Sequence, residues 1–206
     1  MKKLITILFA GLLTLSLSAQ QFGAKAGLDL TDLTITDSDM PDFDMGIGYS
    51  VGVFGEFELS DVVKLKPELL YAHRSSVYEM DLSLLGGGVA TVEIASEFIE
   101  LPINFSYSAI DEFSINAGPF IGFQLSSKVK SDMDGEKEEE DFTDQITNMD
   151  YGFNFGVSTT IIENMIIDVR YVVGLPNIAV TDSGDETVVK SSAIKISFGY
   201  IFGGGY

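Results

Sequence analysis

The stretch FIELPINFSYS, which runs from Phe98 to Ser108, has a period of two residues. Every second residue from Ile99 to Tyr107 is large and apolar, whereas Glu100, Asn104 and Ser106 lie between them. Successive side chains of a strand point to opposite faces. This stretch therefore predicts a strand with one bulky apolar face and one polar face.

The same alternation recurs along the chain, and no stretch beyond residue 20 has a long helical period. Together with residues 99–107 it gives eight strand candidates; the others are 22–30, 47–58, 63–74, 113–125, 151–161, 165–173 and 194–202. The sequence therefore predicts an all-β domain.

The predicted connections fall into two classes that alternate along the chain. Three are tight, near residues 60–61, 110–111 and 162–164, and four are long, at 32–46, 76–92, 129–149 and 176–190. Short turns at one end and longer loops at the other are typical of transmembrane barrels. We expect an eight-stranded antiparallel up-and-down β-barrel with both termini on the periplasmic side.

The two faces of the predicted strands differ in size as well as in polarity. Soluble β-sandwiches and lipocalin-like barrels point their apolar face inward, so a soluble periplasmic barrel with an apolar ligand cavity is an alternative. In an eight-stranded barrel, however, the interior is just wide enough for side chains to fill. The small and charged residues suit that interior, and we expect the bulky face, with aromatic residues near both strand ends, to contact lipid.

Charged residues on the polar face are balanced in sign, which predicts a network of ion pairs in the lumen, because an unpaired buried charge is costly. Such a network favours a plugged barrel over an open pore. We expect a tight turn after Leu59 to place Glu56 opposite Lys64. Glu93 and Glu97 have the outward parity, so that part of their strand is expected to project above the hydrocarbon. The predicted lumen residues are Lys25, Asp29, Glu56, Glu58, Lys64, Lys66, Glu68, Arg74, Glu100, Asp168, Arg170 and Lys195.

The chain opens with MKKLITILFAGLLTLSLSAQQ, in which two lysines precede an apolar run and a small-residue cleavage site. This order predicts a secretory signal peptide over residues 1–19 and a barrel domain over residues 20–206. A transmembrane anchor is the alternative, but the run is short for a span and contains Thr and Ser.

The composition excludes several kinds of site. The chain has no Cys, one His and a net charge of −19. Thiolate metal sites and cysteine nucleophiles are therefore excluded, and nucleic acid is not an expected partner. Glu56, Glu58, Glu68 and Glu100 would be the carboxylates of a hydrolase, but bases match them in number. We predict no catalytic, cofactor-binding or metal-binding residues and no enzyme.

The acidic stretch SDMDGEKEEEDFTD lies in the third long connection. Carboxylates from Asp132 to Asp144 are a candidate site for divalent cations, although the segment lacks the distal glutamate of an EF-hand. A solvated loop is the alternative. The connection near Leu82 is apolar and rich in glycine, and is a candidate cover for the barrel mouth or a contact for a partner.

Several segments resemble PorT-type outer membrane proteins, a group described as the outer membrane protein beta-barrel domain. They are FGAKAGLDLTDL at 22–33, LKPELLYAHR at 65–74, FIELPINFSYS at 98–108, INAGPFIGFQLSSK at 115–128, VRYVVGLPNI at 169–178 and FGYIF at 198–202. The resemblance implies an eight-stranded barrel of OmpA/OmpX shape in the cell outer membrane and does not imply an enzyme.

From the residues and the resemblance together we predict a non-enzymatic outer membrane protein surrounded by membrane lipid. Its acidic outer loops are expected to contact a surface or envelope protein. A narrow channel, or an accessory component of an envelope secretion or transport system, is the alternative.

Overall fold

The computed structural model describes residues 20–35, 44–81, 89–110, 112–133, 136–141, 143, 149–162, 164–175 and 189–202. The predicted signal peptide and most of the apolar connection near Leu82 lie outside these residues. Among the described residues, no helix is long and apolar enough to cross a membrane.

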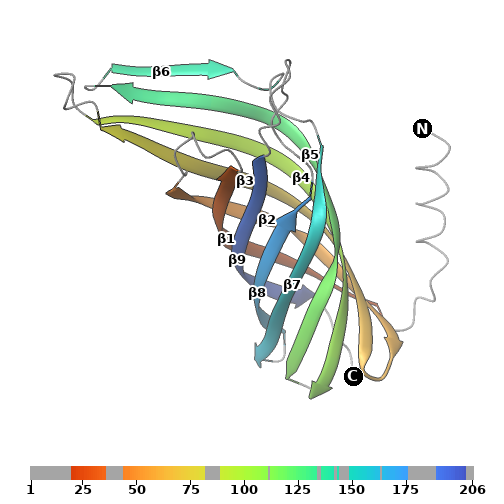
Figure 1. Ribbon diagram of the computed structural model, residues 1–206. Coiled ribbons are helices and arrows are strands. Elements are labelled where there is room, and N and C mark those ends of the chain that lie inside the picture. The colour runs from red at the N-terminus through yellow and green to blue at the C-terminus, as the bar shows by residue number, and fades with distance from the viewer. Residues whose placement is uncertain are drawn as a thin grey trace.

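The described residues form nine strands, all joined in one sheet (Figure 1). The strands are β1 (Gln20–Ile35), β2 (Asp44–Ser60), β3 (Val63–Asp81), β4 (Val89–Ile110), β5 (Phe113–Met133), β6 (Glu136–Asp141), β7 (Met149–Ile162), β8 (Met165–Gly174) and β9 (Val189–Phe202).

Eight of these described strands, all except β6, form a closed antiparallel barrel. Each pairs with its neighbour in the chain, β1 pairs with β9, and the pairing of β4 with β5 closes the ring. The prediction of an eight-stranded up-and-down barrel is confirmed. Phe22 pairs with Phe202, so the first and last strands meet at the end where the tight turns lie.

Three barrel strands are much longer than the sequence pattern predicted. β3 has 19 residues, β4 has 22 and β5 has 21, whereas β8 has 10. The prediction of a long loop at 76–92 is therefore wrong for most of these residues. They belong to strands, because β3 continues to Asp81 and β4 begins at Val89. About ten residues are enough for a tilted strand to cross a membrane, so β3, β4 and β5 continue beyond the barrel wall.

The acidic stretch is partly a strand rather than an irregular loop. β6 pairs with the outer end of β5, from Lys128 opposite Asp141 to Met133 opposite Glu136. Figure 1 shows β6 beside β5 at the tip of a sheet that bends away from the barrel. We call this projecting sheet the outer extension: residues 75–81 of β3, 89–95 of β4, 128–133 of β5, and β6.

The barrel wall has its apolar side chains outside and its polar side chains inside. In β7, exposed and buried residues alternate from Met149 to Phe155. Phe155 is 55 % exposed, whereas its neighbour Asn154 is 2 % exposed. The largest fully buried side chains among the described residues are all polar: Glu100, Asn104, Asn116, Asn154, Asp29, Asp150, Ser106 and Ser127. A soluble barrel would bury its apolar face instead, and the lipid-facing orientation explains this pattern.

The polarity reverses in the outer extension. The pairing of β3 with β4 continues from Leu70 opposite Glu100 to Asp81 opposite Val89 without a register shift, so the alternation of faces persists. Glu100 points into the lumen, and therefore Ile94 and Val92 have the inward parity while Glu93 has the outward one. Glu93 pairs across the outward face with Lys130 at 3.6 Å. Above the wall, the outward face is charged and the inward face is apolar.

The predicted register of the first tight turn is wrong. Glu58, not Glu56, lies opposite Lys64. The strand register shifts between Glu58 and Ser60, so this turn is not an ideal hairpin. The bulge adds a residue to one strand, which the sequence pattern does not reveal. Phe57 lies opposite Leu65, which places Glu56 beside Lys66.

Candidate functional site

The lumen holds three groups of charged side chains, one above the other along the strands. The turn-side group consists of Glu56, Lys64 and Lys66. One carboxylate oxygen of Glu56 lies 3.2 Å from the ammonium of Lys64, and the other lies 2.9 Å from that of Lys66. Phe54, Ile166 and Ile201 form a small apolar cluster of buried residues.

The central group consists of Lys25, Glu68, Asp168 and Arg170, which come from β1, β3 and β8. Arg170 lies 2.6 Å from both Glu68 and Asp168. Lys25 lies 3.1 Å from Glu68 and 3.6 Å from Asp168. Each base therefore contacts both acids, and the group is neutral.

The loop-side group consists of Asp29, Arg74, Glu100, Asp150 and Lys195. Arg74 joins Glu100 and Asp150 at 2.6 Å each. Lys195 joins Glu100 at 2.6 Å and Asp29 at 3.2 Å. Five side chains from five strands thus form one continuous chain of ion pairs.

Neutral polar and aromatic residues support these groups. Ser50 donates a hydrogen bond to Asp29, and the guanidinium of Arg74 lies over the Phe98 ring, 4.5 Å from its centre. Asn154 donates to the backbone carbonyl of Gly118. The eight barrel strands bring these residues together although they are far apart in the sequence. The contacts across the lumen therefore hold the strands in place relative to one another.

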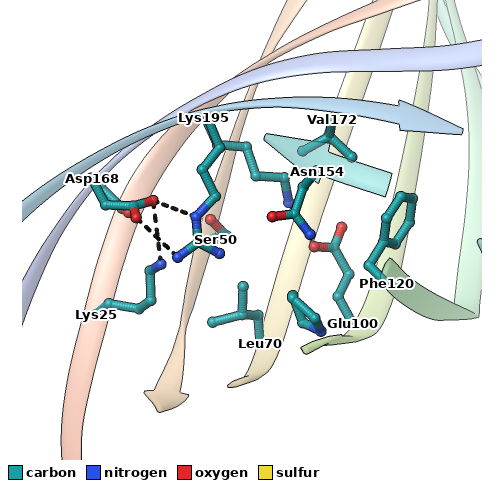
Figure 2. A pocket seen from close by; sticks show the side chains of 12 residues that line it. Lys25, Ser50, Leu70, Glu100, Phe120, Asn154, Asp168, Val172 and Lys195 are labelled. Carbon is teal, nitrogen blue, oxygen red and sulfur yellow. Dashed lines mark hydrogen bonds and ion pairs between the residues drawn. The ribbon is translucent and has the colours of Figure 1, made fainter. Parts of the chain in front are cut away.

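A cavity of about 20 Å³ separates the central group from the loop-side group (Figure 2). Its lining includes Lys25, Asp168, Lys195, Glu100 and Asn154. The Oδ1 atom of Asn154 is buried and has no protein partner. A space of this size accommodates about one water molecule, and an unpaired acceptor on its lining suits a bound water.

Eleven of the twelve predicted lumen residues belong to these three groups. Glu58 does not: it is exposed beside the turn between β2 and β3, so its expected place in the lumen is wrong. Pattern reasoning missed Asp150, which is 1 % exposed and paired with Arg74. Extending the alternation of β7 by one residue before Tyr151 would have identified it.

Replacing Glu58 by Asp150 leaves the lumen charges balanced. The three groups contain six bases and six acids among the described residues. The turn-side group carries one excess base, and the loop-side group carries one excess acid. This balance is what a narrow, poorly hydrated interior requires.

Within the described part of the chain, no three His, Cys, Asp or Glu side chains cluster closely enough to hold a metal ion. The candidate divalent-cation stretch from Asp132 to Asp144 lies partly outside the described residues, so its ligand geometry remains a prediction.

Comparison with known proteins identifies the family. Residues 18–180 match the model of the outer membrane protein beta-barrel domain. No curated protein sequence matches the chain.

Solved structures of bacterial outer membrane barrels have the same fold. Neisserial surface protein A is 11 % identical with a TM-score of 0.57, over 90 % of this chain and 100 % of the other. Ail, the attachment invasion locus protein of Yersinia pestis, in complex with the heparin analogue sucrose octasulfate, is 14 % identical with a TM-score of 0.53, over 89 % of this chain and 99 % of the other. At these identities the likeness establishes the fold alone.

The family match covers more than half of the sequence, and the apolar exterior and ion-paired lumen are those of a barrel that crosses lipid. The chain belongs to the outer membrane protein beta-barrel domain family and is an outer membrane protein.

Proposed function

We propose that the protein is a non-enzymatic surface protein, in which the barrel is a closed membrane anchor and the outer extension binds a cationic partner outside the cell. The observation that carries this proposal is the difference in strand length. β8 crosses the wall with 10 residues, whereas β4 has 22. The additional residues of β3 to β5 are not needed for spanning and present a paired sheet beyond the membrane.

The lumen supports an anchoring role rather than a conducting or catalytic one. Its acids are held by bases in three groups, and the cavity between two of these groups has room for one water. Among the described residues, every carboxylate of the three groups has a basic partner, and this cavity is too small for a substrate. The narrow-channel alternative requires a continuous water path, so absence of single-channel conductance in planar bilayers is the expected result.

The acidic edge of the outer extension supports a cationic partner. β6 reads EKEEED and pairs on one side with β5, at the end of the nine-stranded order. Ail was solved with a sulfated heparin analogue, which is a polyanion. This chain carries a net charge of −19, so a polyanion would be repelled and a basic peptide or divalent cations would be attracted.

Two finer expectations belong to the same proposal: residues 1–19 direct the chain to the envelope and are removed, and the stretch from Asp132 to Asp144 binds divalent cations weakly. The alternative is an accessory role in an envelope secretion or transport system. Co-purification of the intact protein with secretion components from its own membrane tests this alternative.

Binding of an oligolysine peptide to the protein in bilayer nanodiscs tests the proposal. A variant with Glu138→Gln, Glu139→Gln and Glu140→Gln removes three charges from β6. We expect its affinity to fall about tenfold, since each surface charge contributes on the order of 0.5 kcal/mol. The decrease should shrink as salt is raised.

A matched variant removes the same number of charges from the turn end, through Glu58→Gln, Asp61→Asn and Glu112→Gln, all three exposed. It should bind like the unaltered protein. Equal weakening by both variants, or tighter binding of sucrose octasulfate than of oligolysine, would contradict the proposal.

A further inference from the structure

A row of polar and aromatic side chains crosses the outward face of the wall where the outer extension begins. Tyr49 of β2 lies opposite His73 of β3, His73 lies opposite Glu97 of β4, and Glu97 lies opposite Ser126 of β5. Toward the turn end, the outward residues of β4 are Ile99, Leu101, Ile103, Phe105 and Tyr107. The row therefore marks the boundary between the apolar wall and the charged extension.

The aromatic rings of this row form a packed surface. The Tyr49 ring stacks on His73 with centroids 5.2 Å apart, and it lies 6.3 Å from the Tyr71 ring at a tilt of 43°. Tyr49 is 47 % exposed. Nearly half of Tyr49 is thus exposed on the outward side, at the level where we expect the headgroup region of the outer leaflet.

Glu97 completes the surface with a carboxylate. It accepts a hydrogen bond from Ser126 at 3.1 Å, and it interacts electrostatically with the hydroxyl of Tyr71. Among the partners that the structure records for Glu97, two are hydroxyls and none is a base. Glu93, four residues further out on the same strand, is paired with Lys130. Among the described residues, the partners recorded for Glu97 are therefore hydroxyls, whereas Glu93 further out has a recorded basic partner.

We propose that Tyr49, Tyr71 and Glu97 bind the ammonium group of an ethanolamine-bearing lipid headgroup in the outer leaflet. An ammonium donates hydrogen bonds to a carboxylate and is attracted to the face of a tyrosine ring. The acyl chains of the same lipid would lie along the apolar wall below.

Other ligands fit the row less well. A headgroup phosphate alone would be repelled by Glu97, because His73 is the single basic side chain in the row. A calcium ion requires six to eight oxygen ligands, and the row offers one carboxylate. An ammonium needs one carboxylate and one ring face, which the row supplies.

Native mass spectrometry of the detergent-solubilised barrel tests this proposal with two lipids of identical acyl chains. Phosphatidylethanolamine carries the ammonium and phosphatidylglycerol does not. We expect the unaltered protein to retain about fivefold more phosphatidylethanolamine than phosphatidylglycerol. A part-exposed cation–π contact together with a charged hydrogen bond provides a preference of this size. Glu97→Gln keeps a hydrogen-bond acceptor next to Ser126 and Tyr71. It should reduce the ratio of retained phosphatidylethanolamine to phosphatidylglycerol to about one.

Two pairs of matched variants separate this site from general effects of the membrane interface. Glu93→Gln removes an outward carboxylate of the same strand and should leave the preference unchanged. Tyr49→Leu should abolish it, whereas Tyr151→Leu should not, although Tyr151 is 46 % exposed on the same outer half of the wall. Heat-modifiable migration verifies that each variant is folded. Equal retention of the two lipids by the unaltered protein, an undiminished preference in Glu97→Gln, or equal loss in Tyr151→Leu would overturn the proposal.

Discussion

The barrel wall and the outer extension are built from the same strands but have opposite polarity. Along β4, Phe105 faces outward at 52 % exposure while Glu100 is buried in the lumen. A few residues further out, Glu93 faces outward and Ile94 has the inward parity. The pairing of β3 with β4 continues from one region to the other without a register shift, although the pairing of β4 with β5 shifts between Glu97 and Phe98. The alternation of faces along β4 therefore persists, and the backbone of β4 does not cause the change. The surrounding medium does: lipid selects apolar side chains for the outer face of the wall, and water selects charged ones for the extension.

The largest effect should come from breaking a lumen ion pair. Glu100→Leu removes the partner that Arg74 and Lys195 share, each at 2.6 Å. Leaving buried bases without this acid should lower the free energy of unfolding by about 3–5 kcal/mol. Urea unfolding of the protein in phosphatidylcholine vesicles measures it.

The corresponding change in the outer extension is Glu93→Leu. Its side chain and that of Lys130 are 33 % and 44 % exposed, so the loss should stay within about 1 kcal/mol. Similar losses at Glu93 and Glu100 would mean that the lumen is hydrated like the surface.

The outward faces of the two regions should respond differently to a positive charge. Phe155→Arg places arginine in the middle of β7 on the lipid-facing side, where the cost is about 2–4 kcal/mol. Thr91→Arg has the same outward parity in the extension of β4 and should change stability by about 0.5 kcal/mol or less. The same unfolding measurement compares them, and equal costs would contradict the assignment of lipid to one face and water to the other.

Packing near the turn end of the lumen depends on a glycine. A Cβ added at Gly23 would clash with the Phe54 ring and would lie 2.5 Å from the backbone oxygen of Tyr200. Gly23→Ala should therefore destabilise the barrel by about 1–3 kcal/mol. At Gly122 the nearest atom, on Phe98, would be 3.6 Å away, and Gly122→Ala should be nearly neutral. A neutral Gly23→Ala variant would show that the lumen is looser than the structure indicates.

Removing much of the outer extension should have the smallest effect on the barrel. Replacing residues 128–147 by a short glycine-rich turn deletes β6 and the outer end of β5, while the pairing of β5 with β7, from Phe123 opposite Met149 toward the turn end, remains. The variant should still show heat-modifiable migration and an unfolding midpoint close to that of the full chain, because the stability resides in the wall and the lumen. Failure to fold would instead make the extension part of the folding unit.

The sequence predicted the wall well because lipid imposes a strict period of two. The alternation between Ile99 and Tyr107 and the alternation of loops with turns were enough to predict the number of barrel strands and the turn end at which the first and last strands meet. The outer ends of β3 and β4 were not recognised because their polarity reverses, which interrupts the pattern near Ser76 and Val92. β6 was missed because EKEEED contains no apolar residue to reveal a face.

Within the lumen, parity identified most of the charged residues but not their partners. Glu56 was expected opposite Lys64, yet the bulge beside Ser60 moves the register, and Glu56 contacts both Lys64 and Lys66. Which acid meets which base depends on strand stagger around the whole ring. The short contact between Arg74 and Asp150 joins residues 76 positions apart, a distance at which a local pattern carries no information.

The central claim is that the outward face of β4 passes from lipid to water near Glu97. Spin labels can measure this position directly. The chain has no Cys, so single cysteines at Phe105, Glu97 and Glu93, all on the outward side of β4, can each carry a nitroxide in a bilayer. At Phe105 the nitroxide should collide mainly with lipid-soluble oxygen, and at Glu93 it should collide mainly with a water-soluble nickel complex. At Glu97 the two collision rates should be similar. A nickel-accessible label at Phe105, or a label at Glu93 that only oxygen reaches, would contradict the account.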